Sequence, residues 1–133
     1  ASTAFIPKTK RRHVKIFKSS LMRRPPLPSQ VPIAEMTRAA AKMVTRSVDS
    51  FVQGDFALAR AVMEYDDVVD QLFVEVKEHL TDLIRRDESL AGEALDLLMI
   101  AKYLERIGDH AVNVAEWVIY AITGSKPGKV PED

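Results

Sequence analysis

No proline interrupts the long stretch between Ile33 and Thr123, and this feature constrains the fold more than any other. Proline and glycine are the residues that most disfavour the interior of a helix. All seven prolines lie outside the stretch, and within it apolar residues recur every three or four positions, as they do in amphipathic helices. The sequence therefore predicts an all-α fold.

Two short breaks divide this stretch into three helices. The first helix is expected to open near Pro32 and to end at Gly54. Asp55 then caps a second helix, which we expect over residues 56–86. We expect a third to start near Ser89, at the end of the polar run Arg86–Ser89, and to extend to about Thr123. Amphipathic helices joined by short connections pack antiparallel, so we predict a three-helix bundle over residues 31–124.

Both ends of the chain differ in composition from the predicted bundle. Residues 1–30 contain eight Lys and Arg and no acidic residue, and the proline-rich run Pro25–Pro28 closes them. We expect a basic, poorly structured arm over residues 1–30 and a polar tail over residues 125–133. Such an arm can bind nucleic acid, an anionic membrane or an acidic protein surface.

The composition excludes several kinds of site. The chain has no cysteine, so disulfides, thiolate metal ligands and a cysteine nucleophile are absent. This suits a cytoplasmic protein. No apolar run approaches the roughly 18 residues that a membrane span requires. The sequence also shows no glycine-rich phosphate loop and no catalytic triad, so we expect the protein not to be an enzyme.

Four acidic residues form two matching pairs. Asp66 and Asp70 lie four residues apart in the second helix, and Glu105 and Asp109 lie four apart in the third. Residues at this spacing share one face of a helix. If the helices fold back at Arg86–Ser89, the pairs lie opposite each other, roughly 26 Å from the turn at about 1.5 Å per residue. Like charges at this spacing destabilise a helix, so we expect a positive partner.

Two interpretations of these acids stay open. Asp66 interrupts the apolar stripe of its helix, where a carboxylate is costly unless it is paired or bound to a metal. In the first interpretation, the four acids are oxygen ligands of divalent or iron-type ions, such as Mg²⁺, Mn²⁺, Ca²⁺ or iron. These ligands are Asp66, Asp70, Glu105 and Asp109. The candidates for the surrounding shell are Glu64, Asp67, Arg106, His110 and Asn113. In the second, the acids are partly solvated and pair with Lys102, Arg106 or Arg60.

Two segments of the sequence resemble the PhoU family. Residues 103–116, YLERIGDHAVNVAE, are similar to one hallmark motif of that family. Residues 66–72, DDVVDQL, are similar to the other, the E(D)xxxD motif on the preceding helix. The resemblance extends from about Pro32 to Gly124.

The resemblance implies a fold, a role and partners. Family members are cytoplasmic, all-helical proteins made of two three-helix repeats. They regulate phosphate uptake and signalling together with the phosphate ABC transporter and a sensor histidine kinase. Their E(D)xxxD acids bind multinuclear metal clusters, which maps onto Asp66, Asp70, Glu105 and Asp109. This chain resembles a single repeat, the C-terminal one, and a lone repeat exposes the surface that meets its sister, so we expect a homodimer.

Two alternative functions are weighed against this regulatory role. Clustered carboxylates that hold metal ions can activate water, so one alternative is a metal-dependent phosphate-ester hydrolase. The other is a PhoU-like accessory domain of a different phosphate transporter. We do not expect nucleic acid to be a partner, whereas peripheral membrane contact through the basic arm stays open.

Overall fold

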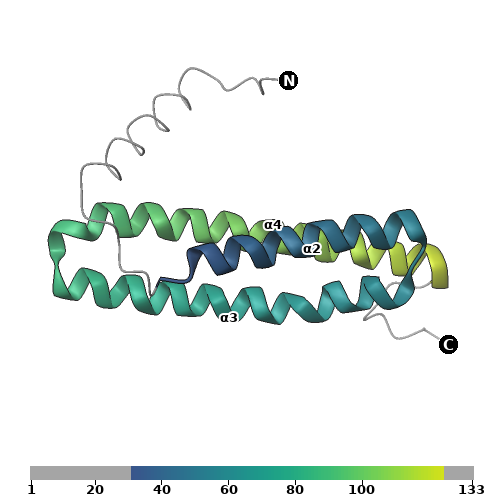
Figure 1. Cartoon of the computed structure of the whole chain (residues 1–133), viewed down its shortest axis with the longest axis horizontal. Helices are drawn as coiled ribbons and strands as arrows, with labels where there is room; N and C mark the ends of the chain where they lie inside the picture. The colour runs from purple at the N-terminus through teal and green to yellow at the C-terminus, as the bar shows by residue number, and fades with distance from the viewer. Residues whose placement is uncertain (1–30, 125–133) are drawn as a thin grey trace, which may run out of the picture. The chain divides into compact units, whose positions relative to one another are not determined.

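Three α-helices that lie side by side form the described part of the chain (Figure 1). The computed structural model describes residues 31–124. Its helices are α2 (Ile33–Gln53), α3 (Phe56–Arg86) and α4 (Ala91–Thr123), and the 3-10 helix η1 (Glu88–Leu90) joins the last two. The predicted all-α three-helix bundle is confirmed. The arm predicted over residues 1–30 and the tail predicted over residues 125–133 lie outside the described residues.

The turn between α2 and α3 is formed by the residues predicted for it. Gly54 ends α2 in the left-handed conformation, with φ of 62°, which glycine adopts without a steric penalty. The Asp55 carboxylate then accepts a hydrogen bond from the backbone N–H of Leu58 at 3.0 Å. This bond satisfies one of the free donors at the start of α3, which begins at Phe56 as expected.

The turn between α3 and α4 is organised by Asp87. Its Oδ1 accepts hydrogen bonds from the backbone N–H of Ser89 at 3.0 Å and from the Ser89 hydroxyl at 2.6 Å. The chain winds through the tighter η1 before it enters α4 at Ala91. The α-helix therefore begins two residues later than the predicted start at Ser89.

The core is built from side chains that repeat every seven residues. The repeat places branched side chains in α3, small residues in α4, and two methionines and a serine in α2. These buried residues are Val62, Val69, Val76 and Leu83 in α3, Ala94, Ala101, Gly108 and Ala115 in α4, and Met36, Met43 and Ser50 in α2. A seven-residue repeat keeps the same face of each helix toward its neighbours along the bundle. Larger side chains of two helices thus face the small residues of the third.

The core-facing side of α4 carries the smaller of its apolar residues. Of the neighbouring pairs Ile107/Gly108 and Val114/Ala115, the structure buries the smaller residue, and Leu95 and Ile122 are exposed. The reason is that α4 carries apolar residues on more than one face, so periodicity alone admits more than one orientation. Close approach of the helix backbones selects the face with the small side chains.

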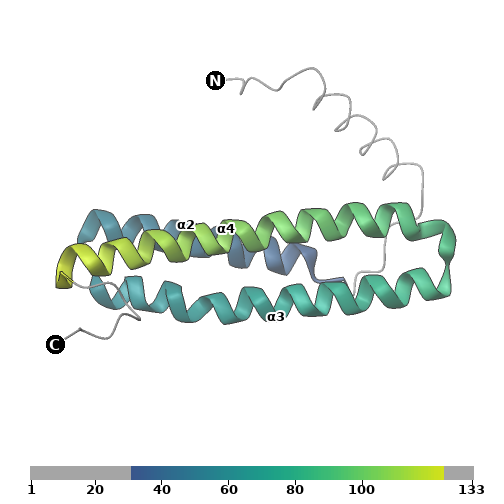
Figure 2. The ribbon, with the colours of Figure 1, turned by 180° about the vertical axis from the view of Figure 1, so that it is seen from behind.

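The helix lengths decide over which part of the bundle all three helices pack together. α2 has 21 residues, against 31 in α3 and 33 in α4, so it covers only part of the hairpin that the longer helices form (Figures 1 and 2). α2 lies along the end of this hairpin that is remote from η1. Within residues 31–124, none of the helices combines the length and apolar content needed to cross a membrane.

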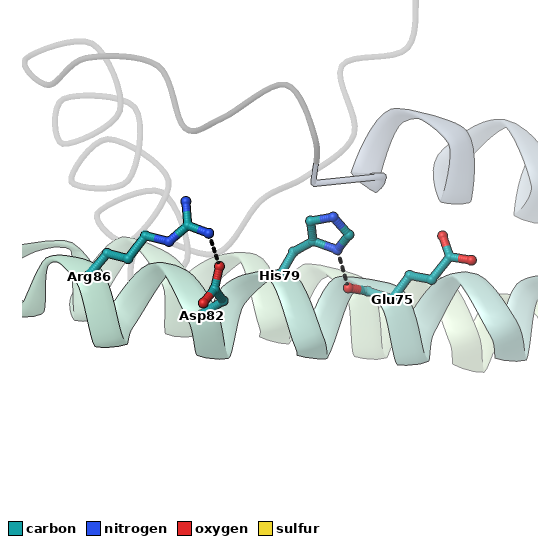
Figure 3. Close-up of polar contacts among 4 residues, drawn as sticks. All are labelled: Glu75, His79, Asp82 and Arg86. Carbon is teal, nitrogen blue, oxygen red and sulfur yellow. Dashed lines mark hydrogen bonds and ion pairs between the residues drawn. The ribbon is translucent and has the colours of Figure 1, made fainter.

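On the exposed side of α3 near η1, two contacts join residues of the same helix. Figure 3 shows Arg86 paired with Asp82 one turn earlier, and His79 Nδ1 at 2.7 Å from the backbone carbonyl oxygen of Glu75. Both interactions join residues four apart in the same helix. Exposed pairs of this kind contribute little stability.

Candidate functional site

Asp66 occupies a core position of α3. The second seven-residue series of this helix runs through Ala59, Asp66, Phe73 and Leu80, and the other three members are apolar. The Asp66 side chain is half-buried, and its Oδ1 is fully buried without a hydrogen-bond partner among the described residues. A buried oxygen in this state is unfavourable, so this carboxylate is the most unusual group of the bundle.

The backbone of α4 lies directly against this carboxylate at Gly108. A Cβ atom added to Gly108 would lie 3.5 Å from Asp66 Oδ1, 3.4 Å from Met43 Sδ and 3.6 Å from Val69 Cγ1. Three helices therefore meet at this level, and the missing side chain leaves the Asp66 oxygen next to the α4 backbone. The sequence predicted that Asp66 is part of the candidate site, but it did not predict that Met43 lies beside it. Periodicity shows which face of α2 is buried, and it does not show which residues of α3 and α4 lie opposite a given residue of α2.

Negative charge accumulates around Asp66 and Asp70. Burial, followed by repulsion from Asp70 and Asp109 and then from Asp67 and Glu105, raises the pKa of Asp66 to about 6. Burial and the charges of Glu105, Asp109 and Asp67 likewise raise the pKa of Asp70, against a smaller opposing effect of Lys102. The electrostatic influence of Glu105 and Asp109 thus reaches across from α4 to both acids of α3.

Lys102 supplies positive charge at one edge of this group. Its Nζ lies 2.6 Å from Glu105 Oε1, three residues away on α4, and 5.4 Å from the centre of the Phe73 ring on α3. The Glu105 side chain is only 16% exposed. Pairing with a lysine, the second interpretation drawn from the sequence, is therefore present for Glu105.

The remaining candidate residues lie on the surface. Asp70 and Asp109 are exposed, and so are all five residues proposed for the surrounding shell, which are Glu64, Asp67, Arg106, His110 and Asn113. The Arg106 guanidinium lies over the Tyr103 ring, with 5.6 Å to its centre. Among residues 31–124, no three acidic or histidine side chains are gathered closely enough to surround one ion.

Comparison with known proteins identifies the family of this chain. The model of the PhoU domain matches residues 33–118, which includes all four acids of the candidate site. The chain belongs to the PhoU family. The predicted resemblance is confirmed, and the PhoU domain lies in the C-terminal part of the chain. No solved structure matches the chain at a significant level.

Three PhoU relatives illustrate the similarity. A phosphate-specific transport system accessory protein PhoU homolog of Methanothermobacter thermautotrophicus is 34% identical over 95 residues, which are 71% of this chain and 43% of the relative. The corresponding protein of Thermotoga maritima is 36% identical over 69% of this chain and 40% of its own length. That of Deinococcus radiodurans is 32% identical over 86% and 54%. The chain thus spans about half or less of the length of these PhoU relatives.

The acids of this PhoU domain suit a hard cation in their chemistry. All four offer carboxylate oxygens, the ligands that Mg²⁺, Mn²⁺, Ca²⁺ and iron accept. The fully buried Asp66 Oδ1 has no donor to satisfy it among the described residues, and burial together with neighbouring negative charges raises the pKa of Asp66. A bound cation would relieve both effects. The side chains of Asp70 and Asp109 are exposed, so they have room to turn toward an ion.

The raised pKa of Asp66 predicts how stability depends on pH. The folded state takes up a proton at about pH 6, whereas the ordinary pKa of the group is 3.8. Between these values the folded state binds more protons, so stability should fall as pH rises from about 4 to 6. In chelator, Asp66→Asn should reduce this slope and stabilise the bundle at pH 7, because it removes a charge that burial and the neighbouring acids disfavour. We expect a gain of about 1 kcal/mol, since solvent screens part of the effect at this half-buried side chain. Urea unfolding at several pH values measures both effects.

A matched control separates this effect from a general loss of charge. Asp96→Asn removes one exposed acid of α4 and should leave the slope between pH 4 and 6 unchanged. Asp70, whose pKa is also raised, accounts for the slope that remains in Asp66→Asn. An Asp66→Asn protein with the same slope as the parent would show that Asp66 is not destabilised in the folded state.

Proposed function

We propose that this chain acts in the cytoplasm as a non-enzymatic regulator of phosphate uptake. The observation that carries the proposal is the match of the PhoU domain over residues 33–118. The relatives are named as accessory proteins of the phosphate-specific transport system, which supports a role beside a phosphate transporter. Because the chain spans only part of their length, this role is an inference from the shared domain.

We infer that the acidic site is the part of the domain that responds to metal ions. Asp66, Asp70, Glu105 and Asp109 would hold divalent or iron-type ions, which supply positive charge between α3 and α4. Support comes from the unsatisfied Asp66 Oδ1 and from the mutual repulsion of the acids across the two helices. Of the four, Asp66 would fix the position of the ion, because its Oδ1 is fully buried and has no hydrogen-bond partner among the described residues.

The proposed partners are the phosphate ABC transporter, a sensor histidine kinase and a second copy of this chain. The exposed apolar side chains of α2 and α4 support a role in protein contacts, since a solvated helix face normally carries few of them. Such surfaces suit an adaptor that acts by binding. The bundle would then position the acidic site while its outer faces contact the partners.

The role is tested by phosphate uptake in the organism that carries the gene. Deletion of the gene should leave uptake in phosphate-rich medium at the level of phosphate-starved cells, and the wild-type gene should restore repression. Asp66→Asn/Asp109→Asn should fail to restore it, whereas the matched exposed pair Glu78→Gln/Asp96→Asn should succeed. Uptake of labelled phosphate is the measurement. Uptake that is the same with and without the gene, in both media, would contradict the proposed role.

A further inference from the structure

The outer side of α4 carries a second apolar stripe. Met99, Tyr103, Trp117 and Tyr120 are 54%, 57%, 56% and 42% exposed, respectively. At about 100° per residue these four positions lie within roughly 100° of one another and nearly opposite Gly108, which faces the core. Trp117 and Tyr120 meet edge to face, with ring centres 5.5 Å apart. α4 thus has a structured aromatic face in addition to its core face.

The order of residues along this stripe is nearly symmetric. It alternates steps of four and three residues and consists of Met99, Tyr103, Arg106, His110, Asn113, Trp117 and Tyr120. Tyr103 lies seven residues before His110, and Trp117 lies seven residues after it. The aromatic and apolar members therefore occupy both ends, and the polar members occupy the middle. This symmetry distinguishes the stripe from an apolar face of random order.

We propose that α4 pairs antiparallel with α4 of a second copy of this chain, about a two-fold axis at His110. In such a pair, a residue seven positions before the axis faces the residue seven positions after it, so Tyr103 of each copy meets Trp117 of the other. A two-fold interface must be complementary to itself, and the near-symmetric stripe meets that condition. The inference rests on the self-association included in the proposed function and gives it a surface and a geometry.

Charges beside the stripe favour the same pairing. Lys102 and Glu116 lie on one edge of α4, eight residues before and six residues after His110. In the antiparallel pair Lys102 of one copy lies beside Glu116 of the other. Glu105 brings a like charge to the same level, and its pairing with Lys102 at 2.6 Å offsets that charge. Asp109 approaches its own symmetry copy near the axis, and Arg106, one turn earlier on each helix, offsets this repulsion.

The length of the stripe limits the strength of the dimer. Met99 to Tyr120 spans roughly 33 Å of helix at about 1.5 Å per residue. A single helix pair of this length buries less than the roughly 800 Å² per partner of a stable interface. We therefore expect a reversible dimer with a dissociation constant in the micromolar range.

Analytical ultracentrifugation of the full 133-residue chain tests whether this stripe of α4 forms the dimer interface. The wild-type chain should convert from monomer to dimer with rising concentration. Tyr103→Ala/Trp117→Ala should raise the dissociation constant roughly tenfold or more, because exposed aromatic residues dominate such interfaces. The control is Phe51→Ala on α2, an aromatic side chain that is 71% exposed and outside the stripe, and it should leave dimerisation unchanged. Circular dichroism should show unchanged helix content in all variants.

Cysteine cross-linking tests the axis, because the chain has no cysteine of its own. Under mild oxidation His110→Cys should form a disulfide-linked dimer, whereas Thr81→Cys, an exposed position on α3, should stay monomeric in denaturing gels. A wild-type chain that stays monomeric up to high micromolar concentration would overturn the proposal. So would equal cross-linking at both positions, or a dimer insensitive to Tyr103→Ala/Trp117→Ala. Each of these results leaves the uptake experiment, and the regulatory role that it tests, unaffected.

Discussion

Replacing Met43 with alanine is expected to lower the free energy of unfolding by about 3 kcal/mol. Met43 is fully buried in α2, at the level where α2, α3 and α4 meet. Its Sδ would lie 3.4 Å from a Cβ atom added to Gly108 of α4, and Val69 of α3 lies near the same point. Because Gly108 has no side chain that could move into the space, truncation of Met43 leaves a cavity that only a backbone shift can fill.

Urea unfolding followed by circular dichroism measures this loss. Met43→Leu, which keeps most of the volume, should cost less than about 1.5 kcal/mol. Thr45→Ala, a truncation at an exposed position of the same helix, should change stability by no more than about 0.5 kcal/mol. If Met43→Ala proved as mild as Thr45→Ala, α2 would not pack on the hairpin at this level.

Divalent cations are expected to raise the thermal stability of this domain markedly. An ion that binds only the folded state, at a free concentration 100 times its dissociation constant, adds about 2.7 kcal/mol. For a bundle of this size that gain corresponds to a rise of about 10 °C in melting temperature. The physical reason is that the ion satisfies the Asp66 oxygen and screens the repulsion among the acids of α3 and α4.

Melting curves with Mg²⁺, Mn²⁺ and Ca²⁺, and with iron under anaerobic conditions, measure the effect against chelator. Asp66→Asn/Asp109→Asn should abolish the rise in melting temperature. The matched pair Glu78→Gln/Asp96→Asn, which removes the same charge from exposed positions, should keep it. An equal rise in both variants would show that the ions bind elsewhere. No rise in the wild-type chain would leave pairing with Lys102 as the interpretation of the acids.

The helices could be predicted from the sequence because their ends are set by local chemistry. Gly54 adopts the left-handed backbone that ends α2, and Asp55 caps α3 with its own carboxylate. These interactions involve residues at most five positions apart, so the sequence pattern determines them without knowledge of the rest of the fold. The start of α4 was wrong by two residues because Asp87 first stabilises a tighter turn.

The orientation of α4 was only partly predictable. Its two apolar faces give similar periodicity, and the aromatic side chains would satisfy a simple rule of hydrophobic burial better than the alanines do. The bundle buries Ala101 and Gly108 and leaves Tyr103 exposed, because only small residues let the α4 backbone come close to α3 and α2. That choice depends on the shape of two other helices, which no local pattern in α4 contains.

The sequence alone determined that this protein forms three long helices and that four carboxylates lie on the two that form the hairpin. It also placed the Asp66 carboxylate within an apolar stripe. Only the tertiary structure decided that one oxygen of Asp66 is buried beside the backbone at Gly108, next to Met43 of α2, while Asp109 remains exposed. Spacing along a helix follows from backbone geometry, whereas the depth of a side chain follows from how closely separate helices approach.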